Sequence, residues 1–470
     1  MKVLSDQIRR IYFVGIGGIG MSALARYFAR QGIEVAGYDR DRSELVQALI
    51  NEGLEVHFEE DVQAMGSPDL VVYTPAVPDD HDQLQAARSA GIAIMKRSEV
   101  LGALSRTMQC IAVAGTHGKT TTSTLVTCLL KQAGVDCTAF LGGISVDLGG
   151  NFVHGEVPWM IAEADEYDRS FLQLTPQIAV ITSLDPDHLD IYGSFGEMKE
   201  AYGAFVERVD SEGVLIVHHA AWPALEDALG GQVRERIASG DLRLVRYGDD
   251  PGCDYSVRDT ATDGYRMVFQ LFQRGQPVYD RIRLAMPGKH NVLNATAAWA
   301  CAAELSRLDP QLDCDIEAGL QSLGTMRGIR RRFEIRHADA QRVIIDDYAH
   351  HPRELEAVIT AAREQFAGRR ITGVFQPHLY SRTRDFHREF AAALSALDVC
   401  ILVDVYPARE QPIPGVRSEM IFEHVRAKEK YCVGKPALIE LLVNVDPEIL
   451  LLMGAGDLDR MIPNIRQALT

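Results

Sequence analysis

The chain has 470 residues, of which 47% are hydrophobic, and a formal net charge of −17. The negative charge argues against nucleic-acid binding through a basic surface, and no apolar run is long enough to cross a membrane. The length predicts about two to four domains. Eight scattered cysteines without a CxxC pair, and a start unlike a signal peptide, predict a reduced, cytoplasmic protein.

A first phosphate-binding motif lies near the N-terminus. Residues 11–14 have the pattern of a buried strand, a Gly-x-Gly-x-x-Gly loop follows, and residues 34–38 form a second predicted strand. The acidic residue after that strand is expected to bond a ribose hydroxyl. A further strand at 70–73 ends in a Thr-Pro loop at the sheet edge where ligands bind. The residues expected at this site are Gly15, Gly17, Gly18, Gly20, Asp39, Thr74 and Pro75.

A second phosphate-binding motif occupies residues 110–123, where a short strand, a glycine loop and a helix start succeed one another. The loop N–H groups and the helix N-terminus should point at anionic oxygens. Lys119 would add positive charge near the β- and γ-phosphates, and the Thr120 hydroxyl is suited to Mg²⁺. The residues expected to bind the nucleotide are Gly115, Thr116, His117, Gly118, Lys119, Thr120 and Thr121. Two such sites predict two different nucleotides.

Acidic residues and a histidine follow two later strands on the same predicted edge, at residues 163–166 and 185–190. They are candidate metal ligands, although each acid alone is equally well explained as a turn or cap residue. Segments 140–143 and 149–151 have the composition of turns near the phosphates. Asn291 and Asn294 share a helix face and would suit a base edge or ribose, or equally serve as structural caps.

The C-terminal third has the pattern of another parallel α/β unit, with strands at 343–345, 371–375, 399–403 and 449–453. A linker at 323–329 precedes it, and Gly324–Gly328 are the hinge we expect. Three arginines, residues 330–332, follow this hinge and would clamp phosphates or remain solvated.

These motifs together resemble the Mur ligases of peptidoglycan synthesis, and the resemblance covers essentially the whole chain. It is carried by residues 15–22, 115–122, 163–166, 187–190, 290–294, 331–333, 347–352 and 375–378, together with Arg382. It implies an α/β fold of three domains. Residues 1–105 would be a Rossmann-like domain for a UDP-sugar. Residues 106–325 would be a P-loop ATPase-like mixed sheet for ATP, and residues 326–470 a Rossmann-like domain contacting ATP and the amino acid.

The resemblance also implies an activity. The expected reaction joins L-alanine to the lactyl carboxylate of UDP-N-acetylmuramate through an acyl phosphate, with ATP and one or two Mg²⁺ ions, in a monomer or homodimer. The implied catalytic residues are Lys119, His188 and Arg332. The implied metal ligands are Thr120, His188 and either Glu163 or Glu166, of which we choose Glu163 because it stands first in the Glu-x-x-Glu motif. Asn291, Asn294, Arg332 and Asp347 would approach ATP, and Tyr348, His350, His351, His378 and Arg382 would line the amino-acid site. Several relatives carry a carbamoylated lysine near the position of Gly203, and we assign none here.

Three other functions are compatible with parts of the sequence. A recycling ligase of the same family would attach a whole tripeptide to UDP-N-acetylmuramate. A nicotinamide-dependent dehydrogenase would use the first glycine motif but would leave the second unexplained. A nucleotide-binding switch would form no amide product.

Overall fold

The computed structural model describes residues 8–187, 189–408 and 410–469. The chain forms two compact units. The first comprises the chain up to Asp259 with Phe269–Arg283 and Val292–Thr325, and the second comprises Thr260–Val268, Leu284–Asn291 and the chain from Met326. Within the described ranges no helix is long and apolar enough to cross a membrane.

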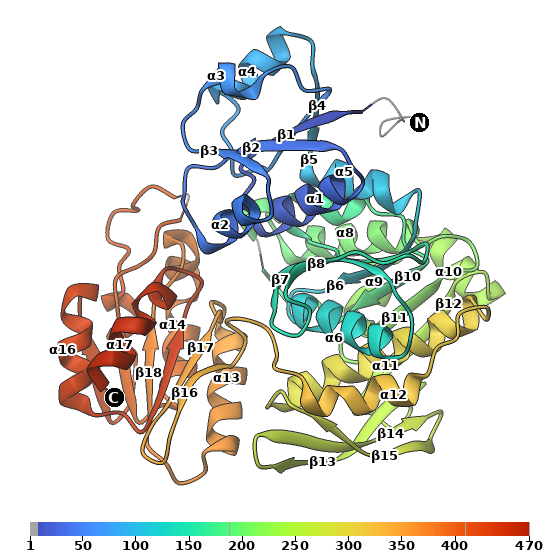
Figure 1. Ribbon diagram of the computed structural model, residues 1–470. Helices are drawn as coiled ribbons and strands as arrows, with labels where there is room; N and C mark the ends of the chain where they lie inside the picture. The colour runs from blue at the N-terminus through green and yellow to red at the C-terminus, as the bar shows by residue number, and fades with distance from the viewer. Residues whose placement is uncertain (1–7, 188, 409, 470) are drawn as a thin grey trace. The chain divides into compact units, whose positions relative to one another are not determined.

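The N-terminal sheet has five parallel strands in the order β3-β2-β1-β4-β5. Its elements are β1 (Arg10–Val14), α1 (Ile19–Arg30), β2 (Glu34–Tyr38), α2 (Glu44–Asn51), β3 (Glu55–His57), α3 (Val62–Met65), β4 (Leu70–Tyr73), α4 (Asp82–Ser89), β5 (Ala93–Lys96) and α5 (Arg97–Ser105). Alternate residues of β1 enter two apolar cores: Ile11 and Phe13 join the side of α1 and α5, and Tyr12 and Val14 join the opposite side. Figure 1 shows these blue strands with a helical layer on each side.

The second sheet has ten strands in the order β15-β14-β13-β12-β11-β10-β6-β9-β7-β8. Its strands are β6 (Gln109–Ala114), β7 (Thr138–Ser145), β8 (Gly150–Val153), β9 (Trp159–Glu163), β10 (Ile178–Ile181), β11 (Val214–His218), β12 (Arg243–Gly248), β13 (Tyr255–Asp263), β14 (Arg266–Gln273) and β15 (Gln276–Leu284). Its helices are α6 (Lys119–Gln132), η1 (Tyr167–Gln173), α7 (Leu189–Tyr192), α8 (Phe195–Glu207), α9 (Trp222–Ala228), α10 (Gly231–Ser239), α11 (Lys289–Leu308), α12 (Ile316–Ser322) and η2 (Leu323–Thr325). From β12 to β7 neighbouring strands are parallel, so their carboxyl ends share one edge.

The expectation of a turn at 140–143 was wrong, and of the segment 149–151 only Gly149 lies in a turn. The first segment lies inside β7, and Gly150 begins β8, which pairs antiparallel with β7. The side chain of Asn151 is fully buried and its amide donates to Ser22 Oγ over 2.9 Å, so this hairpin ties the second sheet to α1. The glycines in these segments suggested turns, but the pairing of β7 with β8 places most of them in strands.

The third sheet lies in the second unit and has the order β16-β17-β21-β18-β19-β20, with β16 antiparallel. Its elements are β16 (Glu334–Ala338), β17 (Val343–Asp347), α13 (Pro352–Gln365), β18 (Ile371–Phe375), α14 (Tyr380–Leu394), β19 (Val399–Leu402), α15 (Glu419–Phe422), β20 (Glu429–Cys432), α16 (Lys435–Val445), β21 (Ile449–Met453), η3 (Leu458–Met461) and α17 (Ile462–Leu469). Successive residues of β17 face opposite cores, with α13 and α14 on one side and α16 and α17 on the other (Figure 1). The chain is therefore α/β, with three parallel-rich sheets.

Candidate functional site

The first glycine loop connects β1 to α1. Its turn is closed by two N–H groups, of Gly15 and Ile16, that donate to the Tyr38 carbonyl over 2.8 and 2.9 Å. The Asp39 Oδ2 atom accepts from the Gly17 N–H over 2.8 Å, and its Oδ1 atom accepts from the Asp41 N–H over 3.0 Å. Asp39 therefore supports the loop itself, in addition to the ribose contact expected from the sequence. Thr74 lies beside the loop, with its methyl group 3.3 Å from where a Cβ on Gly15 would be. Pro75 follows it.

The third glycine of this motif makes room for an arginine. A Cβ on Gly20 would lie 2.8 Å from Arg97 Cδ, so a side chain at this position would force the arginine away from the first turn of α1. The neighbouring Gly18 is the N-cap of that helix. The guanidinium of Arg97 reaches Asp165, with 3.9 Å between Nη2 and Oδ2. Arg97 thus connects the first glycine loop to the carboxyl end of β9.

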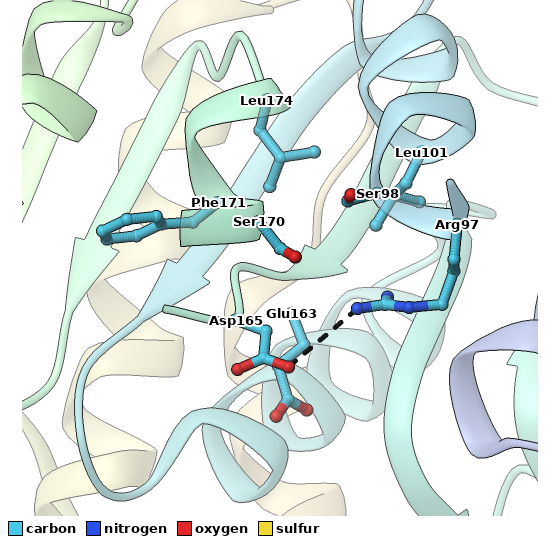
Figure 2. A pocket seen from close by; sticks show the side chains of 8 residues that line it. All are labelled: Arg97, Ser98, Leu101, Glu163, Asp165, Ser170, Phe171 and Leu174. Carbon is cyan, nitrogen blue, oxygen red and sulfur yellow. Dashed lines mark ion pairs between the residues drawn. The ribbon is translucent and has the colours of Figure 1, made fainter. Parts of the chain in front are cut away.

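A pocket opens where these groups meet, between α5 and η1 (Figure 2). It is lined by Arg97, Ser98, Leu101, Glu163, Asp165, Ser170, Phe171 and Leu174. Figure 2 shows the guanidinium of Arg97 pointing toward the carboxylates of Asp165 and Glu163, with apolar side chains at the opposite end. The pocket therefore has one charged end and one apolar end.

The second glycine loop is formed by the register of its strands. Val113 of β6 pairs with Glu163 of β9, and Ala114 pairs with Ile181 of β10, so the loop after β6 lies between the ends of two neighbours. Gly118 is the N-cap of α6 and has φ of +83°, a conformation that glycine adopts without strain. The first N–H groups of α6 therefore face outward as donors for an anion.

Side chains of the β10 edge fix the remaining loop residues. The Ser183 hydroxyl accepts from the His117 N–H over 2.8 Å and lies 2.9 Å from the Thr116 hydroxyl. The Thr182 hydroxyl donates to the His117 carbonyl. The His117 imidazole lies 3.8 Å from the Asp185 carboxylate. These contacts hold the loop rigid, which is the arrangement that a phosphate site built from backbone N–H groups requires.

Lys119 is held inside the loop by a buried ion pair. Its Nζ atom donates to the Gly115 carbonyl over 2.7 Å and lies 2.7 Å from Oε2 of Glu166, whose side chain is fully buried. Burial alone would lower the Lys119 pKa, but Glu166, Asp165 and Glu163 raise it. Burial also raises the pKa of Glu166 to about 7, against the effect of Lys119. The 2.7 Å contact between the two groups, together with the bond from Lys119 to the Gly115 carbonyl, favours the ionised form of the pair.

Two oxygen atoms suited to a hard cation lie beside this lysine. The Thr120 hydroxyl donates to Oε2 of Glu163 over 2.9 Å. Carboxylate and hydroxyl oxygens are the ligands that Mg²⁺ takes together with nucleotide phosphates, so this pair fits the ion. A Cβ on Gly142 of β7 would lie only 1.9 Å from the same Glu163 oxygen. His188, the third expected ligand, lies outside the described residues. Thr121 is buried in the first turn of α6.

The two asparagines of α11 have different surroundings. The Asn294 carbonyl oxygen accepts from the Thr122 hydroxyl over 3.2 Å and lies 2.7 Å from where a Cβ on Gly118 would be. Asn294 is therefore next to the phosphate loop. The Asn291 amide donates to the Pro287 carbonyl over 2.7 Å, so it stabilises the start of the helix.

In the second unit, Asp347 at the carboxyl end of β17 contacts the backbone that follows the three arginines, residues 330–332. The Asp347 carboxylate accepts from the N–H groups of Phe333 and Ala349 over 2.7 and 2.8 Å. Burial raises the Asp347 pKa to about 6, and the charge of Arg332 opposes the rise. The guanidinium of Arg332 lies 5.5 Å from the Tyr348 ring centre. Arg331, by contrast, donates to the carbonyls of Gly454 and Gly456 and has a structural role.

Only some of the residues expected to line the amino-acid site lie close to one another. The rings of Tyr348 and His350 are 5.2 Å apart, and those of His350 and His378 are 5.9 Å apart. His351 instead packs against Phe386, with ring centres 5.2 Å apart, and is the N-cap of α13. Of the two adjacent histidines, His350 is therefore the one grouped with His378. Arg382 is buried near the start of α14.

Sequence reasoning gave no role to Arg97, placed Asp165 only among the candidate metal-binding acids, and did not foresee that Glu166 would pair with Lys119. Their types gave a weak signal, since a basic residue after a strand and acids at a strand end are common. Neither Gly20 nor the number of residues between the two glycine motifs indicated that Arg97 would lie beside Gly20 and reach Asp165.

Three family profiles match successive parts of the chain. Family profiles match residues 10–109 as the catalytic domain of the Mur ligase family, residues 113–302 as the Mur ligase middle domain and residues 331–456 as its glutamate ligase domain. A UDP-N-acetylmuramate–L-alanine ligase of Porphyromonas gingivalis strain W83 is 44% identical, over 98% of this chain and 99% of its own. A protein of the same name from Parabacteroides distasonis is 42% identical, over 99% and 98%.

Solved structures give the same similarity. The crystal structure of a UDP-N-acetylmuramate–alanine ligase from Thermotoga maritima has a TM-score of 0.80, with 30% identity over 98% of each chain. A murein peptide ligase from Psychrobacter arcticus has a TM-score of 0.71 and 22% identity over 98% of each chain, which supports the shared fold alone.

Proposed function

Because this chain belongs to the Mur ligase family, we propose that it is an ATP-dependent ligase that joins L-alanine to the lactyl carboxylate of UDP-N-acetylmuramate. The observation that carries the proposal is the full-length similarity to L-alanine ligases at 44% and 42% identity. The reaction would pass through an acyl phosphate. ATP, UDP-N-acetylmuramate and L-alanine are the small molecules that the protein would bind, as a monomer or homodimer.

We assign the ATP phosphates to the loop from Gly115 to Thr121. Its N–H groups and the N-terminus of α6 offer donors, and Lys119 is already aimed along the loop by its bond to the Gly115 carbonyl. On ATP binding, the Lys119 ammonium would exchange part of its pairing with Glu166 for phosphate oxygens. Glu166 thus keeps the lysine charged and in place before the nucleotide arrives.

We propose that Thr120 and Glu163, with His188, hold one or two Mg²⁺ ions. The 2.9 Å contact between the Thr120 and Glu163 oxygens supports the first two, because both would reach the same ion. Bound Mg²⁺ would neutralise charge on the transferring phosphoryl group. The N–H groups of the loop and the ammonium of Lys119 stabilise the same charge.

The UDP-sugar would bind at the glycine loop after β1, with Asp39 holding the loop and Thr74 and Pro75 beside it. We propose that its lactyl carboxylate contacts Arg97 at the charged end of the pocket of Figure 2. A guanidinium matches a carboxylate in two parallel hydrogen bonds, and Asp165 limits its freedom to rotate. The acid would then lie near Glu163 and the phosphate loop.

The domain division at residues 105 and 325, with Gly324–Gly328 as hinge, remains part of this proposal. Arg332, Asp347 and Asn291 would complete the nucleotide site. Tyr348, His350, His378 and Arg382 would bind the amino acid, and the contact of His351 with Phe386 favours a supporting role for that histidine. An acyl phosphate is destroyed by water, so shielding of this site is required during the reaction.

Phosphate release from ATP in the presence of UDP-N-acetylmuramate tests the proposal. L-alanine, glycine, L-serine and the murein tripeptide would be compared as acceptors, with the amide product identified by mass spectrometry. We expect turnover with L-alanine to be the fastest. Preference for the tripeptide would instead identify a recycling ligase, and ADP formation without amide would contradict ligase activity.

A further inference from the structure

A cluster of metal-binding side chains lies at the carboxyl edge of the second sheet, on strands that the proposed reaction does not use. β11 ends at His218, and its neighbour β12 ends at Gly248. The two strands are parallel, with His218 paired to Tyr247, and the His219 N–H continues the pairing to the Tyr247 carbonyl over 2.9 Å. This register brings the imidazoles of His218 and His219 next to Asp249, which follows β12.

The ligand atoms of the three side chains converge. One nitrogen of each histidine and one carboxylate oxygen of Asp249 all lie within 4.8 Å of one another. His219 Nε2 is 2.8 Å from Asp249 Oδ1, and the two imidazole centres are 4.8 Å apart. The His218 Nε2 atom is buried and has no hydrogen-bond partner among the described residues.

The residue between the strand and the aspartate permits this approach. A Cβ at Gly248 would lie 2.3 Å from His219 Cδ2 and 3.3 Å from His218 Nε2. Any side chain at this position would therefore push the imidazoles away.

We propose that His218, His219 and Asp249 form a site for a divalent transition-metal ion of the Zn²⁺ class, separate from the Mg²⁺ of the nucleotide. Two imidazoles and one carboxylate are a ligand set that Zn²⁺ takes, with the remaining position left to water. Mg²⁺ prefers oxygen ligands in octahedral geometry and does not suit two nitrogens. Bound metal would connect the ends of β11 and β12, because it takes a ligand from each.

Isothermal titration calorimetry of the full-length, chelator-treated protein with ZnCl₂ tests this site. The buffer contains Mg²⁺ at about a hundredfold excess over Zn²⁺, so that sites for Mg²⁺ are already occupied. The variants are His218→Gln, His219→Gln and Asp249→Asn. His337→Gln is the matched control, because His337 Nε2 lies 2.7 Å from Asp339 Oδ2 and repeats the His–Asp pair without a second imidazole. Asp249 is largely exposed, so its substitution tests the site even where a change at the half-buried His218 disturbs folding.

The proposal expects one Zn²⁺ per chain, a rise of Kd by about tenfold or more in each of the three variants, and no change in His337→Gln. Zn²⁺ should also raise the Tm of the starting protein and not that of Asp249→Asn. Absence of Zn²⁺ binding, or equal binding by the starting protein and all three variants, would overturn the proposal. Either result leaves the ligase assay unaffected, so the two proposals fail independently.

Discussion

Gly142→Ala gives the sharpest test of the metal role proposed for Glu163. Gly142 lies in β7, and an added Cβ would be 1.9 Å from Glu163 Oε2 and 2.5 Å from its carboxyl carbon. Ordinary contact begins near 3.5 Å, so the carboxylate must retreat by about 1.5 Å. That movement breaks the 2.9 Å bond that Oε2 accepts from Thr120.

The displacement should affect catalysis far more than stability. Mg²⁺ requires its oxygens at about 2.0–2.1 Å in near-ideal geometry, so a ligand moved by over an ångström is lost. Disturbing the support of a metal typically costs about 10- to 100-fold in affinity or activity, or about 1.4–2.7 kcal/mol. The clashing atom is the flexible end of a side chain, so the free energy of unfolding should fall by no more than about 1 kcal/mol.

Phosphate release measured across a Mg²⁺ titration would report this effect. Gly150→Ala is the matched control, because Gly150 lies in the adjacent strand β8 and a Cβ there meets no atom within 4 Å. We expect Gly142→Ala to require more Mg²⁺ and turn over at least about tenfold more slowly, with Gly150→Ala unchanged. Equal Mg²⁺ dependence in the two variants, with both folded by circular dichroism, would refute the reasoning.

Three further outcomes follow from the site. Lys119→Ala should abolish turnover while UDP-N-acetylmuramate binding, followed by calorimetry, stays near normal; loss of both would contradict the separation of the two nucleotide sites. Glu166→Gln leaves the buried Lys119 ammonium without its carboxylate partner, so the free energy of unfolding, measured in urea, should fall by about 3 kcal/mol. Glu235 is exposed, and the control Glu235→Gln should change the free energy of unfolding by less than about 0.5 kcal/mol. Asp39→Asn weakens the 2.8 Å bond from the Gly17 N–H and should raise the Kd for UDP-N-acetylmuramate about tenfold with little change in the apparent affinity for ATP; an unchanged Kd would show that the loop holds without it.

The glycine loops show how far local sequence reaches. Each loop was predicted from a strand, glycines at fixed spacing and a helix start, and the structure has β1 and β6 followed by α1 and α6 at those places. The conformation at Gly118 depends on a few neighbouring bonds, so a short stretch of sequence determines it. The parallel α/β character was likewise predictable from apolar strands alternating with helices.

The sequence by itself therefore determined the family, through short motifs spread along the chain. It also determined the α/β class and the two phosphate loops, because each of these depends on residues that are close together along the chain. Only the tertiary structure decided which distant side chains meet. Arg97 reaches Asp165, and His219 reaches Asp249, across 68 and 30 positions of the sequence, through helix packing in one case and strand register in the other. Register is fixed by the pairing of whole strands and the cores on both faces, so no local pattern encodes such contacts.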